Sequence, residues 1–146
     1  MSRHFRLEQA ERLLPEVERA LRDAIVQKTE YEAADGELQR SMEKIRMAGG
    51  SRVSPGPILA LRARKDGAST AVAAAVERVN ELGAQIKDLE IGLIDFPALY
   101  QGREVLLCWK LGEDRIAFWH GVDEGFRGRK PIDDEFRENH RGDSPN

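Results

Sequence analysis

The sequence predicts an α+β protein in which a long antiparallel helical hairpin packs on a small antiparallel β-sheet of about three strands. Apolar residues recur at heptad spacing in two segments separated by a loop rich in glycine and proline, which is typical of two paired helices. After Gly83 the apolar residues alternate with polar ones instead, which is typical of β-strands. A length of 146 residues fits one domain. We therefore expect one domain over residues 1–132, with the helical arm at 7–83 and the β-region at 86–122.

The first predicted helix follows a coiled-coil-like seam of residues spaced alternately three and four apart. All of them except Lys28 and Asp35 are apolar, and the residues between them are mostly charged. Pro15 lacks the N–H that would bond to the preceding turn, and it disfavours helical geometry at the residue before it. We therefore expect a short helix over 7–14, a break or a kink, and a longer helix from Pro15. The seam consists of Leu7, Ala10, Leu14, Val17, Leu21, Ala24, Lys28, Tyr31, Asp35, Leu38, Met42 and Ile45.

The second predicted helix follows the segment AGGSRVSPGP (48–57), whose glycines and prolines end the first helix. Its seam is rich in alanine, so the two helices can approach closely as an antiparallel hairpin. A lone hairpin would leave apolar residues beside both seams exposed, and monomers rarely expose large apolar patches. We therefore expect a homodimer, most simply a two-fold four-helix arrangement. The second seam consists of Ile58, Leu61, Lys65, Ala68, Val72, Ala75, Val79, Leu82 and Ile86.

The β-region is predicted to begin with a strand in the segment IKDLEIGLIDFPALY (86–100), in which Leu89, Ile91 and Leu93 alternate with Asp88, Glu90 and Gly92 and which Pro97 ends. Segment 102–122 then reads as two strands around a turn with the sequence GEDR at 112–115. A hairpin with this turn places Leu107 opposite His120, so that Cys108 lies on the other face of the sheet from His120. Both tryptophans lie in this segment, and we expect their large rings to anchor the sheet on the helices.

The composition limits the class of protein. The formal net charge is −3 and there is no basic stripe, which argues against binding to nucleic acid or to an anionic membrane surface. A single cysteine cannot form an internal disulfide, and no apolar run is long enough for a secretory signal or a membrane span. We therefore expect a cytoplasmic protein. The last segment, 133–146, is polar without periodicity, and we expect a flexible tail there.

Three stretches of the chain carry a resemblance to a known family: FRLEQAERLLPEV at 5–17, KDLEIGLIDFPAL at 87–99, and GREVLLCWKLGEDRIAFWH followed by GFRGRKPI within 102–132. Together they resemble a bacterial family that carries a domain of unknown function, the 2203 family. The helical arm is similar in pattern rather than by letter, and Arg6 stands where relatives would carry a Ser or Thr helix cap. The resemblance implies a small cytoplasmic bacterial protein, and it implies no activity.

Asp95 and His120 are the candidate catalytic residues. If the strand faces that carry Asp95 and His120 both pack against the helices, the Asp95 carboxylate could bind one ring nitrogen of His120. It would then tune the imidazole as a base or a metal ligand. Alternatively, Asp95 bonds backbone N–H groups in a turn and His120 lies half in water at a strand end. Cys108 could be an activated thiol, although a small buried apolar group is the simpler reading.

Other polar groups could also hold an ion or a partner. Asp88, His120 and Glu124 are weak candidate metal ligands, together with Asp95 and Asp123, but their spacing does not force them together, so no metal or other cofactor is expected. Glycines surround Arg127, Arg129 and Lys130, and such a loop suits phosphate or carboxylate, although a solvated turn would look the same. The aromatic and basic edge around Trp119, His120 and Arg129 is the candidate interaction surface.

No common enzyme signature is present: there is no phosphate-binding loop, HExxH, CxxC or GxSxG motif. The sequence therefore favours a protein-interaction or scaffold module that self-associates through its helical arm and binds an unidentified protein partner. The alternative is a small metal-dependent or anion-binding enzyme with a site around Asp95, His120 and Arg129.

Overall fold

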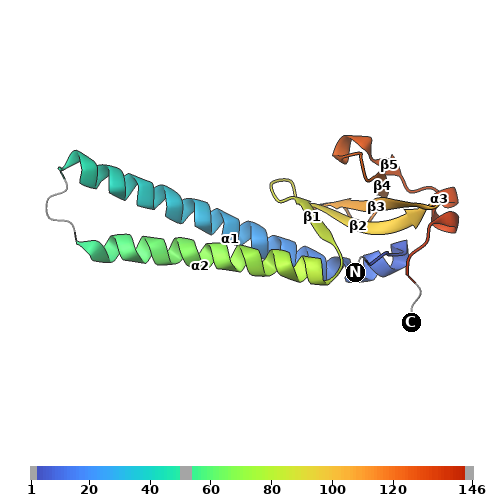
Figure 1. Ribbon diagram of the computed structural model, residues 1–146, viewed down its shortest axis with the longest axis horizontal. Helices are drawn as coiled ribbons and strands as arrows, with labels where there is room; N and C mark the ends of the chain where they lie inside the picture. The colour runs from blue at the N-terminus through green and yellow to red at the C-terminus, as the bar shows by residue number, and fades with distance from the viewer. Residues whose placement is uncertain (1–2, 50–53, 144–146) are drawn as a thin grey trace. The chain divides into compact units, whose positions relative to one another are not determined.

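The computed structural model describes residues 3–49 and 54–143, and their elements confirm the predicted α+β class (Figure 1). The chain divides into two compact units: residues 1–21 with 76–146, which we call the sheet unit, and residues 22–75, which we call the arm. In the described ranges, no helix carries an apolar stretch long enough to cross a membrane. The elements in chain order are α1 (Leu7–Met47), α2 (Pro55–Glu81), β1 (Gln85–Asp88), β2 (Leu93–Tyr100), β3 (Arg103–Lys110), β4 (Phe118–Gly121), the 3-10 turn η1 (Phe126–Gly128), β5 (Lys130–Pro131) and α3 (Asp134–Asn139).

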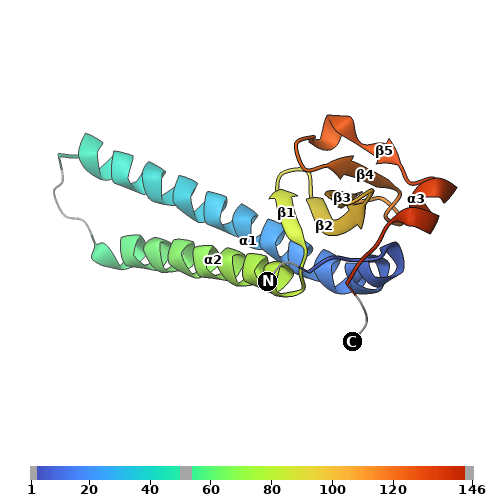
Figure 2. The same ribbon diagram turned by 45° about the vertical axis from the view of Figure 1, so that its right-hand side comes forward.

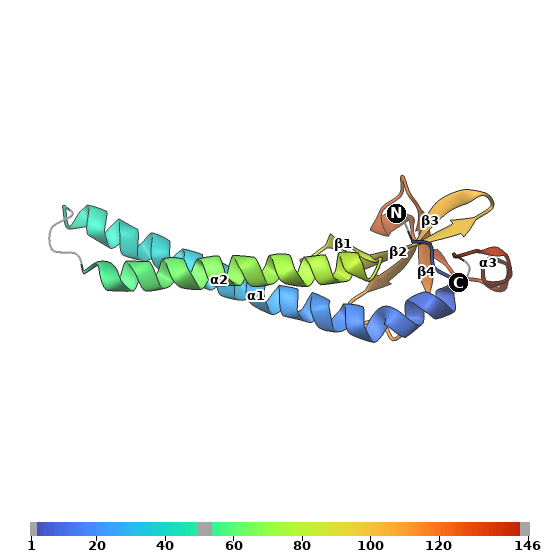
Figure 3. The ribbon, with the colours of Figure 1, turned by 60° about the horizontal axis from the view of Figure 1, so that its bottom comes forward.

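Within the arm, α1 and α2 lie side by side and run in opposite directions (Figures 1 and 3). Asp35 and Lys65, each a polar exception in its own seam, face each other as an ion pair of 2.9 Å. Hydrogen bonding to Asp35 raises the pKa of Lys65, whose ammonium also lies 5.5 Å from the ring centroid of Tyr31. Because a polar pair at a seam fits only one alignment of two helices, it fixes how far one helix is shifted along the other.

Helix α1 is continuous through Pro15, so the predicted break between residues 14 and 15 is wrong. Proline removes one backbone hydrogen bond, but the residues around it hold the helix in place. Leu14 and Val17 are buried in the sheet unit, while Pro15 itself is exposed. Burial of the seam on both sides of the proline outweighs the missing bond.

The sheet has five strands rather than about three, in the order β1-β2-β3-β4-β5, and every neighbouring pair is antiparallel (Figure 1). The predicted first strand, which was to run through Leu89, Ile91 and Leu93 up to Pro97, is wrong in its first part, because residues 89–92 form a turn between β1 and β2. The Asp88 carboxylate accepts the N–H groups of Glu90 and Ile91 at 2.9 and 3.3 Å, and Gly92 has a φ of +71°. An aspartate followed by a left-handed glycine makes a turn more stable than the strand that the alternating residues suggest.

Pro97 does not end its strand but lies inside β2, opposite Leu106 of β3. The Pro97 carbonyl accepts the N–H of Phe5 at 2.7 Å, and Leu99 exchanges two hydrogen bonds with Arg141. These contacts show that odd-numbered residues of this part of β2 direct their backbone groups away from β3. The missing N–H of Pro97 therefore falls on the outer side of the strand and costs the β2–β3 ladder nothing.

The β3–β4 hairpin has a register one residue away from the predicted one. Leu106, not Leu107, lies opposite His120, and Leu107 lies opposite Trp119. The connection spans residues 111–117 instead of a tight GEDR turn, and Glu113 shapes it by accepting bonds from Trp109 Nε1 and from the Lys110 N–H. Because side chains alternate along a strand, this slip moves His120 to the face that carries Cys108.

The segment from 133 to 143 is ordered, so the prediction of a flexible tail is wrong for these residues; residues 144–146 lie outside the described part. Asp133 caps α3 by accepting the Phe136 N–H, and Phe136 and His140 are buried at 1% exposure each. The His140 ring donates from Nδ1 to the Phe136 carbonyl and accepts the first-turn N–H of Leu7 at Nε2, at 2.8 and 2.9 Å. This places α3 beside the start of α1 (Figure 2).

Candidate functional site

Asp95 on β2 and His120 on β4 meet across the central strand β3. Asp95 lies opposite Cys108 and His120 opposite Leu106, so all four side chains share one face of the sheet. His120 Nε2 lies 3.1 Å from Asp95 Oδ1, and the residues are 3% and 0% exposed. The structure thus brings the two candidate catalytic residues together, in a place that solvent does not reach.

Cys108 completes the group from the strand between them. One ligand atom each from Asp95, Cys108 and His120 lie within 4.8 Å of one another, and all three residues are buried. Burial, and to a smaller extent the negative charge of Asp95, raise the pKa of the Cys108 thiol to about 12, against the lowering effect of the nearby Arg129. The register predicted from the sequence paired Leu107 with His120, and it therefore placed Cys108 on the face opposite His120. The true register pairs Leu106 with His120 and places Cys108 on the same face.

The hydrogen bonds of the group leave one buried atom without a partner. His120 Nδ1 lies 2.8 Å from the Gly121 carbonyl, and its Nε2 faces the Asp95 carboxylate. The second carboxylate oxygen, Asp95 Oδ2, is buried and has no hydrogen-bond partner among the described residues. A buried carboxylate oxygen without a donor is costly, and such atoms in native proteins call for an explanation.

Arg129, a candidate for anion binding, is already occupied by protein groups. Its guanidinium binds both carboxylate oxygens of Glu113 at 3.1 Å and lies between two rings, 4.1 Å from the Phe118 centroid and 4.3 Å from the Phe126 centroid. Phe118 lies opposite Cys108 in the sheet, so this cluster lies on the same face as the buried group. Both bonds come from Nη1, so this is not the two-nitrogen fork of a bidentate pair. The Glu113 carboxylate and the two rings nevertheless leave the Arg129 side chain only 12% exposed, so little of the guanidinium is open to an anion.

The other two residues of the candidate anion site do not join Arg129 around an open space. The Lys130 ammonium binds Glu124 at 2.6 Å and lies 4.7 Å from the Trp119 ring centroid, while Arg127 is exposed on η1. Hydrogen bonding from Lys130, and then from the Gly121 N–H, lowers the pKa of Glu124. The basic loop is therefore largely neutralised by the protein's own carboxylates.

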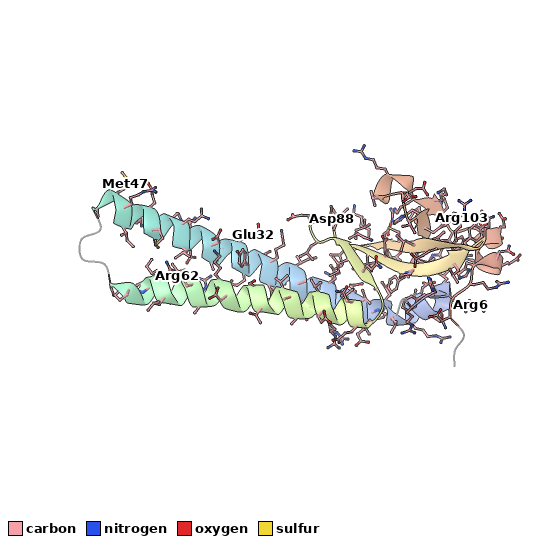
Figure 4. The ribbon with its side chains drawn as sticks, in the orientation of Figure 1. Arg6, Glu32, Met47, Arg62, Asp88 and Arg103 are labelled. Atoms are coloured by element: carbon pink, nitrogen blue, oxygen red, sulfur yellow. The ribbon has the colours of Figure 1, made fainter. Side chains whose placement is uncertain are left out.

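The weak candidate metal ligands are not assembled either. Asp88, labelled at the end of β1 in Figure 4, is used by the turn that follows it. Glu124 is held by Lys130 and Gly121, and Asp123 is exposed in the loop after β4. Within the described residues, the only group of three or more candidate ligands close enough to hold one metal ion is Asp95, Cys108 and His120.

Trp119, the centre of the candidate interaction surface, is half-buried and belongs to an aromatic cluster with Tyr100 and Phe136. Its ring centroid lies 5.3 Å from that of Tyr100 and 4.9 Å from that of Phe136. The same side chain borders a shallow cleft of about 430 Å³ whose other walls include Tyr100, Arg103, Glu124 and Lys130. One edge of the indole is therefore available at the surface, whereas its body supports α3.

Two important residues, Glu113 and His140, were not among the residues predicted from the sequence, and Cys108 was predicted to lie on the face opposite His120. Cys108 and Glu113 depend on the length of the hairpin connection, which the GEDR sequence does not reveal. For His140 a signal existed, because Phe136 and His140 are spaced four apart and so share one face of a helix. The two rings are indeed stacked, with centroids 5.0 Å apart.

Comparison with known proteins gives a family and no activity. Residues 3–132 match the family described as "Uncharacterized conserved protein (DUF2203)". No curated protein and no solved structure matches the chain. The matched segment contains Asp95, Cys108 and His120 and ends before α3. Because the match covers most of the sequence, the chain belongs to the DUF2203 family of uncharacterized conserved proteins.

Proposed function

We propose that this protein is an interaction module that self-associates through its arm, residues 22–75. The partner that covers the arm is a second copy of the chain. The two helices of its arm pack against the two helices of the first copy's arm and form a four-helix arrangement. Two-fold symmetry is the simplest closed form of such an assembly. A further protein partner would then bind a dimer rather than a single chain.

The observation that carries this proposal is the lack of a large-residue core in the arm. Among its described residues, 22–49 and 54–75, the fully buried apolar side chains are all alanines: Ala24, Ala34, Ala68 and Ala75. Larger seam residues such as Leu38 and Leu61 are only half-buried, and Met42 and Leu59 are 43% and 61% exposed. Two helices alone do not enclose a core, so a second pair would remove these side chains from water.

The shape and charge of one groove favour a second copy as the occupant. Leu38, Met42 and Ile45 of α1 line a groove in the arm, and charged residues of both signs surround it. Its acidic residues include Asp35 and Glu43, and its basic residues include Arg46, Arg62 and Lys65; Arg62 lies on α2 (Figure 4). Asp35 pairs with Lys65 and Glu43 pairs with Arg46 within the chain, so the charges around the groove nearly cancel and would not repel a second copy of the same surface.

The alternative of an enzyme around Asp95, His120 and Arg129 has weaker support. Asp95 and His120 are buried, so a substrate has no contact with them, and Arg129 donates from Nη1 to Glu113 with its side chain only 12% exposed. A general base must come within hydrogen-bond reach of its substrate, and these three residues offer no such position.

Sedimentation velocity over a range of concentrations tests the proposal. We expect the wild-type chain to be a dimer that dissociates on dilution. Met42→Lys should weaken dimerisation about tenfold or more, because it places a charge in the apolar groove, equivalent to about 1.4 kcal/mol or more. The substitution should leave the monomer folded, because Met42 is exposed.

Ile91→Lys is the matched control, since Ile91 is 40% exposed and lies in the turn between β1 and β2, outside the arm. This variant should dimerise like the wild type. A wild-type chain that stays monomeric at the highest concentration would overturn the proposal. Equal weakening by both lysine variants would show that the arm is not the interface.

A further inference from the structure

We propose that Asp95, Cys108 and His120 form a binding site for one divalent transition-metal ion of the zinc class. The proposal is independent of self-association, because all three residues lie in the sheet unit. The group combines three kinds of donor atom from three neighbouring strands: a carboxylate oxygen, a thiol sulfur and an imidazole nitrogen.

The distances suit a single small ion. Zinc bonds of about 2.0–2.3 Å place neighbouring donors of a tetrahedron about 3.3–3.8 Å apart. The three donor atoms already lie within 4.8 Å of one another, and His120 Nε2 and Asp95 Oδ1 are 3.1 Å apart. Side-chain shifts of about 1 Å would bring all three donor atoms onto one ion without moving the strands.

The unpartnered oxygen of Asp95 is the second observation that points to a ligand. Oδ1 faces His120, whereas Oδ2 is buried with no donor among the described residues. A cation bound through Oδ2 would satisfy this oxygen, and together with the thiolate and the imidazole it would have three protein donors. Zinc sites with three protein ligands complete their tetrahedron with one external ligand such as water.

The orientation of His120 fits the role of a ligand. In the neutral ring whose Nδ1–H donates to the Gly121 carbonyl, the Nε2 lone pair points at the Asp95 carboxylate, which is itself an acceptor. A cation between two acceptors turns this contact into an attraction. Metal-bound histidines commonly use the second ring nitrogen in this way to fix the ring against a backbone carbonyl.

The donor set and the surrounding charge select the type of ion. A thiolate and an imidazole favour zinc, cobalt or a similar transition metal over magnesium and calcium, which prefer oxygen ligands. The two anionic donors balance a divalent ion, and Arg129 and Glu113 beside them form a neutral pair. The site is therefore balanced in charge when it is occupied, as a buried site must be.

Cobalt titration of the purified full-length chain, after removal of metals with a chelator, tests this proposal. We expect one Co²⁺ per chain, with a thiolate-to-cobalt absorption band and the visible bands of a tetrahedral site, and we expect Zn²⁺ to displace it. The chain has one cysteine, so a thiolate band can come only from Cys108. Asp95→Asn and Cys108→Ser should each lower the affinity at least tenfold.

His4→Ala is the matched control, because His4 lies on the surface of the same unit and pairs with Glu104. This variant should bind Co²⁺ like the wild type. A wild-type chain without a stoichiometric thiolate band would overturn the proposal and leave Asp95 and His120 as a plain buried pair. Should the two site variants fail to fold, the wild-type band alone decides, since the protein offers no second thiolate.

Discussion

At the scale of the residue, the sheet unit is unusual in the polar groups it buries. Asp95 and His120 on one face of the sheet are joined by Cys108, while His140 is buried at the C-cap of α3. Two of these groups have well-defined partners: His140 links α3 to the first turn of α1, and His120 links β4 to β2. Each buried polar contact therefore connects segments that are far apart in the sequence, which is how such contacts specify one arrangement of elements.

Cys108 should be almost unreactive in the native metal-free protein. Its pKa of about 12 keeps the thiol protonated at neutral pH, and only the thiolate attacks alkylating reagents. We expect alkylation by iodoacetamide at pH 8 to be at least about 100-fold slower than in the urea-unfolded chain, whose thiol returns to its ordinary pKa of about 8.5. Mass spectrometry of quenched samples measures both rates, and equal rates would contradict the burial of this side chain.

At the scale of the element, tertiary contacts decide where helices and strands begin and end. Helix α1 passes through Pro15 because its seam is buried on both sides, and β2 passes through Pro97 because that backbone position faces away from β3. Proline ends an element only where the N–H that it lacks would be needed, or where nothing else holds the chain.

Pro15→Ala should stabilise the protein. The substitution restores an N–H that can bond to the Glu11 carbonyl, and Pro15 is exposed, so no packing is lost. We expect the free energy of unfolding to rise by about 1–3 kcal/mol, up to the difference in helix propensity between the two residues. Urea denaturation followed by circular dichroism measures the change.

Arg19→Ala serves as the comparison for that experiment, because Arg19 is exposed on the same helix and its substitution leaves the backbone hydrogen bonds intact. Its effect should stay within about 0.5 kcal/mol. If Pro15→Ala instead destabilised the chain, the ring of Pro15 would be contributing packing that its exposure does not indicate.

At the scale of the whole molecule, the large buried side chains are unevenly divided between the two units. Trp109, Phe5, Phe96 and Phe136 all lie in the sheet unit, whereas the buried residues among the described part of the arm are alanines. Helices α1 and α2 extend through both units, so one pair of helices has a large-residue core along part of its length and lacks one along the rest.

Hydrogen exchange should reveal this division. At concentrations where the chain is monomeric, backbone amides of α1 and α2 within the arm should exchange at least about tenfold faster than those of β2 and β3, because fewer buried apolar contacts oppose local opening. Mass spectrometry of peptide fragments measures the rates. Raising the concentration should protect the arm selectively if it is the association surface, and uniform protection of both units in the monomer would contradict the uneven core.

The candidate site shows how far sequence alone could go. The residue types and the alternation of strands were enough to single out Asp95 and His120 as a pair. The addition of Cys108 required the true register of β3 against β4, because a slip of one residue reverses every side chain. That register depends on the connection at 111–117, where Glu113 bonds to Trp109 and Lys110, and such contacts cannot be inferred from the four letters of a turn.

The sequence by itself determined the α+β class, the two helices of the arm and the membership of a family, since these follow from periodic patterns and from long matching stretches. The number of strands and helix α3 became clear only from the tertiary structure. The same holds for the continuation of α1 through Pro15 and of β2 through Pro97, and for the grouping of the buried donors Asp95, Cys108 and His120. The physical reason is that periodicity records which face of an element is buried. It does not record which distant element buries that face, or which residue lies opposite which.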